Sequence, residues 1–168
     1  NDVNYRLTTV RYFGNGEEEA DFSGQSSRNI EIDGWGLYLW AARKYIDASG
    51  DIAWLEEVTH YGDTVYEAME AGIGQALAKN LEATGIAVAD ASIWEVHWDY
   101  REHFLYTSAA IGRGLCDMAA IATMKENNSD HEKYKILADA VKFAISHYFT
   151  DSNGVLVSSL ERLSKGRN

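Results

Sequence analysis

The strongest constraint on the fold is a helical spacing of apolar residues that recurs along the chain. Between residues 34 and 48, apolar side chains follow one another at intervals of three and four: Trp35, Tyr38, Leu39, Ala42, Tyr45 and Ile46. This spacing places them on one side of an α-helix, and such a side has to be buried against other elements. The same pattern recurs in residues 64–81, 105–126 and 129–148. The sequence therefore predicts a mainly α protein.

Caps and turns divide the predicted helices into pairs. Asp51 follows the first helix and is placed to cap the second, while Ser129 and Glu132 match a capping box that opens the fourth. The turns within each pair are short, whereas the segment 82–104 is long and links the second helix to the third. We therefore expect two antiparallel α/α helical hairpins over residues 27–150.

Residues typical of strands flank the helical region on both sides. Residues 5–13 read YRLTTVRYF and residues 154–160 read GVLVSSL. Their β-branched and aromatic side chains favour strands over helices. We expect a strand and loop over residues 1–26 and a short strand and tail over residues 151–168, so that the chain forms a single helical unit with short flanking β-strands.

The antiparallel arrangement predicts which helix ends lie together. The first and third helices run in the same direction, so their N-terminal ends lie at one end of the assembly. Asp33 is placed to cap the first helix, and the segment 90–108 leads into the third. Both are therefore expected at the same rim.

The segment 90–108, DASIWEVHWDYREHFLYTS, combines a carboxylate with aromatic rings. Glu95 follows Trp94 directly, and Trp98 comes shortly after it. A carboxyl group beside apolar rings loses hydration, so its pKa rises and it can hold a proton for delivery to a leaving oxygen. Flat aromatic faces also suit the apolar faces of pyranose rings. The spacing leaves a second interpretation open, in which these rings are core aromatics beside a solvated glutamate.

Two motifs in the chain match a known family. Residues 92–95 read SIWE and are followed by YTS at 106–108 at the start of a helix, while residues 32–37 read IDGWGL. The first motif resembles the general-acid region of the glucoamylase family, glycoside hydrolase family 15, and the second resembles its Asp-Gly segment. The similarity runs from about residue 27 to residue 148.

The resemblance implies an (α/α)6 barrel whose inner helices open onto a sugar-binding pocket. It implies that Glu95 is the general acid and that Asp33, Trp94 and Trp98 bind substrate. No position here matches the family's catalytic base, and two hairpins do not close a barrel of six, so we expect the chain to form part of the barrel. Val96 stands where fungal members carry a second glutamate, which leaves the linkage preference open.

Composition excludes several other classes of protein. The 168 residues are 46% hydrophobic, which is enough for one core. The formal net charge of -11 argues against nucleic acid and anionic membrane surfaces, whereas a neutral α-glucan meets no such objection. No apolar run approaches the ~20 residues of a membrane span, and the opening residues do not resemble a signal peptide. We expect a soluble protein, either secreted or cytoplasmic.

The cysteine and histidine content gives no sign of a metal or cofactor. Cys116 is the single cysteine, and its apolar helical neighbours predict a buried, inert thiol. The five histidines show no metal-ligand spacing on one helix face. His97 and His103 fall in the aromatic segment, where contact with a sugar hydroxyl competes with an ordinary loop role.

These observations leave three functional hypotheses. The first is exo-acting, inverting hydrolysis of α-glucosidic bonds in an α-glucan or related glucoside, with an oligosaccharide or polysaccharide as substrate. The alternative is a non-catalytic carbohydrate-binding or structural fragment of a larger helical-barrel protein. A phosphorylase ranks third, because it needs a basic phosphate site and only Arg101 lies nearby. In each case the remainder of the barrel, or another chain, is expected to cover the open apolar edge.

Overall fold

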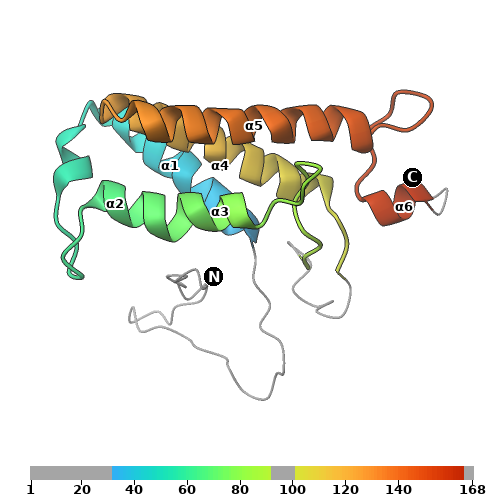
Figure 1. Cartoon of the computed structure of the whole chain (residues 1–168), viewed down its shortest axis with the longest axis horizontal. Coiled ribbons are helices and arrows are strands. Elements are labelled where there is room, and N and C mark those ends of the chain that lie inside the picture. Colours follow the sequence, from blue (N-terminus) through green and yellow to red (C-terminus); the bar gives the residue numbers. More distant parts are fainter. Residues whose placement is uncertain (1–31, 92–100, 165–168) are drawn as a thin grey trace, which may run out of the picture.

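The computed structural model describes residues 32–91 and 101–164, and this part of the chain is mainly helical, as predicted (Figure 1). The long helices are α1 (Ile32–Ser49), α4 (Leu105–Met124) and α5 (Asn128–Tyr148). A composite helix consists of α2 (Val65–Met69), the π-helical η2 (Glu70–Gly74) and α3 (Gln75–Lys79). The short elements are the 3-10 helix η1 (Ala53–Glu56) and α6 (Leu160–Ser164).

Helix α1 begins at Ile32, earlier than the predicted start at residue 34. It ends where Gly50 adopts a φ of 72° and donates its N–H to the Ile46 carbonyl at 2.8 Å. A left-handed glycine of this kind closes a helix because it lacks a Cβ. Asp33 consequently lies inside the first turn of α1, whereas the sequence predicted it in the capping position before the helix.

The predicted second helix forms as one rod with a π-helical turn in its middle. Thr64 and Glu67 form a reciprocal capping box at its start. The π-helical turn contains the glycine pair of residues 72–74. At Gly74, an added Cβ would lie 2.8 Å from the hydroxyl of Tyr134 in α5. Glycine at this position therefore permits a close contact between the two helices.

Helices α4 and α5 form the second hairpin. Asn127 caps α5, since its side-chain oxygen accepts a hydrogen bond from the Asp130 N–H at 3.1 Å. The predicted capping box of Ser129 and Glu132 is therefore wrong. Helix α5 begins at Asn128, so Ser129 is already helical and the residue before the helix supplies the cap.

Two of these helices run in the same direction and touch through their backbones. Figure 1 shows α1 and α4 parallel, with the α2–α3 rod and α5 running the opposite way. An added Cβ on Gly114 of α4 would lie 2.6 Å from the Cα of Gly36 in α1. The described helices therefore form two antiparallel pairs, and α1 and α4 start at the same end of the assembly. Within residues 32–91 and 101–164 the helices do not close into a barrel.

The strand predicted at residues 154–160 does not form. An isolated bridge joins Thr150 to Leu156, and α6 already begins at Leu160. The turn before the bridge and the helix after it leave too few residues for a ladder. The other predicted strand, at residues 5–13, lies outside the described residues.

The prediction of a buried thiol at Cys116 is also wrong. Helix α4 buries Ile111, Leu115 and Met118, which share one side of the helix. Cys116 follows Leu115 around the helix and is exposed. The apolar neighbours of Cys116 in the sequence predicted that its side chain is buried. Its position around the helix instead places the side chain on the exposed side.

Candidate functional site

The N-terminal ends of α1 and α4 meet at a pair of polar side chains. Asp33, in the first turn of α1, is only 8% exposed. Tyr106, the second residue of α4, lies close enough for the charge of Asp33 to act on its hydroxyl. Burial and the charge of Asp33 raise the pKa of the Tyr106 hydroxyl above its ordinary value. The phenol therefore keeps its proton at neutral pH.

A second polar contact fixes the chain just before α4. Asp90 and Glu102 exchange both main-chain hydrogen bonds, each 3.1 Å long. The Asp90 carboxylate also accepts the hydroxyl proton of Thr107, at 3.0 and 3.2 Å from its two oxygens. Both side chains are buried. A carboxylate at this position is further stabilised by the positive end of the α4 dipole.

These contacts bring Asp33 and the ends of the segment 91–101 to one rim. Tyr106 and Thr107 are neighbours in α4, so their partners Asp33 and Asp90 lie at the same helix end. The Asp90–Glu102 pairing holds the two flanks of the segment together.

Of the predicted site residues, the structure describes Asp33 alone. The predicted general acid Glu95 and the predicted substrate-binding residues Trp94 and Trp98 lie outside the described residues. Their roles stay predictions from the sequence.

Sequence reasoning did not assign site roles to Asp90, Tyr106 or Thr107. A hydroxyl residue in the first turn of a helix often bonds to a nearby polar group, so Thr107 carried a weak signal. Its pairing with Asp90 joins residues that are 17 apart in the sequence, and no local spacing encodes a contact of this kind.

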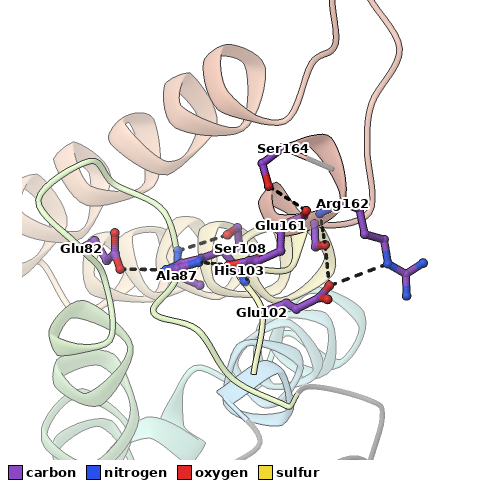
Figure 2. A network of polar contacts seen from close by, with 9 residues as sticks. Glu82, Ala87, Glu102, His103, Ser108, Glu161, Arg162 and Ser164 are labelled. Carbon is purple, nitrogen blue, oxygen red and sulfur yellow. Dashed lines mark hydrogen bonds and ion pairs between the residues drawn. The ribbon is translucent and has the colours of Figure 1, made fainter. Parts of the chain in front are cut away.

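A polar network adjoins the rim on the side of α6 (Figure 2). His103 lies 2.6 Å from Glu161 through Nδ1 and 2.9 Å from Glu82 through Nε2. Both ring nitrogens are engaged by carboxylates. Both polar atoms of the ring therefore already have partners within the protein, which argues against the predicted contact of His103 with a sugar hydroxyl.

The described part of the rim carries buried carboxylates and hydroxyls. Carboxylates accept hydrogen bonds, and hydroxyls both accept and donate them. Among residues 32–91 and 101–164, no cluster of three or more His, Cys, Asp or Glu side chains is arranged to hold a metal. In the same part of the chain, no helix has both the length and the apolar character needed to cross a membrane.

A shallow hollow lies at the other end of the two parallel helices. Ile52 and Glu56 line it on the side of α1, and Met124 and Lys125 line it on the side of α4. Lys125 and Glu56 form an ion pair there. The hollow is therefore distant from the rim that carries Asp33 and Asp90.

No protein-family model and no curated protein matches the chain.

Proposed function

We propose that this chain supplies the general-acid side of a glucoamylase-type glycoside hydrolase that cleaves α-glucosidic bonds with inversion. The observation that supports the proposal best is the Asp90–Glu102 pairing. It joins the two flanks of the segment that carries Glu95, and the Asp90–Thr107 hydrogen bond holds these flanks at the start of α4, near Asp33.

Glu95 would donate its proton to the glycosidic oxygen as the bond to the anomeric carbon breaks. A second carboxylate, about 6.5–9.5 Å from the acid in inverting enzymes, would take a proton from the attacking water. Trp94 and Trp98 would exclude water and so keep the pKa of Glu95 high enough for it to act as an acid. Asp33 would accept a hydrogen bond from a sugar hydroxyl. The base is not assigned to a residue of this sequence.

We further propose that the two hairpins belong to an (α/α)6 barrel. Helices α1 and α4 would be neighbouring inner helices, and the α2–α3 rod and α5 would be outer ones. In support, α1 carries large apolar side chains away from the core, with Leu37 41% and Trp40 40% exposed. Further hairpins or another chain would cover this face.

The test is glucose release from maltotetraose by the natural polypeptide that contains this sequence. We expect Glu95→Gln to lower kcat at least a hundredfold, because general-acid catalysis contributes about 10²- to 10⁴-fold. The exposed Glu57→Gln is the matched control and should leave kcat unchanged. NMR of the first product should show β-glucose, as inversion requires.

The outcomes separate the proposal from its alternative. Near-normal turnover in Glu95→Gln would exclude Glu95 as the acid. If the natural polypeptide binds maltotetraose but cleaves neither it nor isomaltose and trehalose, the chain belongs to a carbohydrate-binding or structural protein. Initial release of α-glucose would exclude the inverting mechanism.

A further inference from the structure

His103 is held between two carboxylates from distant parts of the chain (Figure 2). Nδ1 lies 2.6 Å from Oε1 of Glu161, at the start of α6. Nε2 lies 2.9 Å from Oε1 of Glu82, in the turn after α3. The other oxygen of Glu161 accepts the main-chain N–H of His103 at 2.9 Å. One imidazole thus links α6, the turn after α3 and the start of α4.

The geometry determines the protonation state of the ring. A neutral imidazole carries a single N–H and can donate to only one of the two carboxylates. The second ring nitrogen would then place a lone pair against a carboxylate oxygen. At a pH where carboxyl groups are ionised, both contacts are favourable together only when the ring is an imidazolium.

We propose that His103 is a pH-sensitive clamp: its imidazolium ties the turn of residues 81–87 to the start of α4, and loss of its proton releases Glu82. Glu161 is retained in the neutral state, because its contact is shorter and its other oxygen still accepts the His103 main-chain N–H. This inference does not depend on the proposed glycosidase activity.

The surrounding charges favour the imidazolium. Burial alone would lower the pKa of His103, but its hydrogen bonds to Glu161 and Glu82 outweigh burial and raise the pKa above 6.5. Figure 2 also shows Glu102 and Arg162 near His103, and the side chains of these two residues lie 3.8 Å apart and pair with each other. Glu102 also accepts the Ser159 hydroxyl at 2.5 Å.

The pH window follows from the direction of each shift. The folded-state pKa of His103 is raised, so its stabilising effect is complete below the ordinary value of 6.5 and is lost as pH rises through the folded-state pKa. Burial alone would raise the pKa of Glu161, but hydrogen bonds from His103 outweigh burial and lower it below 4.5. The effect of Glu161 is therefore complete above 4.5 and is lost as pH falls through its folded-state pKa. The clamp is therefore strongest between about 4.5 and 6.5.

The contact that is released has a defined structural consequence. The turn of residues 81–87 is closed by a bridge between Leu81 and Ala87. The Ala87 N–H donates to the hydroxyl of Ser108 in α4, at 3.1 Å. Glu82, through His103, and Ala87, through Ser108, thus both connect the turn of residues 81–87 to the start of α4. Loss of the Glu82 contact should loosen the Ala87 contact, whereas α6 should stay in place.

The first measurement is an NMR titration of the His103 ring nitrogens in the full chain. We expect both to be protonated at pH 6, with a midpoint above 6.5. Glu82→Gln removes one carboxylate at an exposed position and should lower the midpoint. His60→Gln, which removes an exposed histidine elsewhere, is the control and should leave it unchanged. A midpoint at or below 6.5, or one that Glu82→Gln does not lower, would overturn the proposal.

Hydrogen exchange measures the release itself. Between pH 6 and pH 8.5, after correction for intrinsic rates, the Ala87 amide should lose protection. The Leu160 amide, which donates to the His103 carbonyl at 3.2 Å, should keep its protection. Glu82→Gln should remove most of the pH dependence at Ala87. If Ala87 protection is independent of pH, or if Leu160 loses protection equally, the clamp does not work as proposed.

Discussion

At the scale of single residues, the rim depends on one buried carboxylate. Asp90 is 4% exposed and accepts the hydroxyl proton of Thr107, which is fully buried. A charged group removed from water is stable only where hydrogen bonds replace its hydration. The Thr107 bond therefore does more than fill space, because it compensates a charge at the base of the segment 91–101.

Replacing Thr107 by valine tests this compensation. The two side chains have nearly the same shape, so Thr107→Val removes the donor and leaves the packing volume almost unchanged. We expect the free energy of unfolding to fall by about 1.5–3 kcal/mol, as for hydrogen bonds to charged groups. Urea denaturation should show a lower midpoint with an unchanged slope.

Thr84→Val, at an exposed turn position, is the control for Thr107→Val. It should change the unfolding free energy by less than about 0.5 kcal/mol. A loss of the same size in both variants would show that the Asp90 contact contributes nothing specific.

At the scale of elements, parallel packing of α1 and α4 depends on small residues at their crossing. Gly36 and Gly114 bring the two backbones into direct contact. Glycine weakens a helix by about 1 kcal/mol relative to alanine. Its presence inside both helices is therefore explained by the close approach that it permits and not by helix propensity.

Gly114→Ala should destabilise the protein although alanine favours helix formation. Its Cβ would lie 2.6 Å from the Gly36 Cα and 3.1 Å from the Gly36 carbonyl oxygen, so the helices must separate. Overpacking of this kind costs about 1–3 kcal/mol. Thermal unfolding should show a lower Tm.

Gly34→Ala is the control in the partner helix, because an added Cβ there meets nothing within 4 Å. It should leave Tm unchanged or raise it slightly. If both alanine variants are equally stable, backbone contact does not determine how α1 and α4 pack.

The accuracy of the sequence-based predictions depended on how local each signal was. The long helices were predictable because the spacing of residues such as Leu39, Ala42 and Ile46 is set by the helix itself. The N-cap of α5 is Asn127, two residues before the predicted Ser129. Sequence patterns locate a helix end only to within one or two residues. The Asp90–Thr107 contact could not be predicted, because it joins residues that are 17 apart in the sequence.

At the scale of the whole molecule, two kinds of contact hold the hairpins together. One is the apolar and glycine-rich contact between α1 and α4. The other is polar and joins η2 to α5, where Glu70 accepts hydrogen bonds from Tyr134 at 2.6 Å and Lys133 at 2.9 Å. Gln75 donates to the second oxygen of Glu70 at 2.9 Å.

This polar contact makes the docking of the hairpins sensitive to acid. Burial alone would raise the pKa of Glu70, but hydrogen bonds from Tyr134, Lys133 and Gln75 outweigh burial and lower it below 4.5. The folded state therefore favours the ionised carboxylate. Its contribution is present above the ordinary pKa and is lost as pH falls through the folded-state value.

Glu70→Gln should therefore lower stability at pH 7 and have a smaller effect in acid. The amide still fits the site but cannot form the ion pair with Lys133, so we expect a loss of about 1.5–3 kcal/mol at pH 7. Below pH 4.5 the wild-type carboxylate becomes protonated and loses the same interaction, so the two unfolding curves should converge.

Urea denaturation from pH 3.5 to 7 measures the difference, with the exposed Glu57→Gln as control. A deficit that stays constant over this range would mean that the amide disrupts packing and that the charge of Glu70 does not hold the hairpins together.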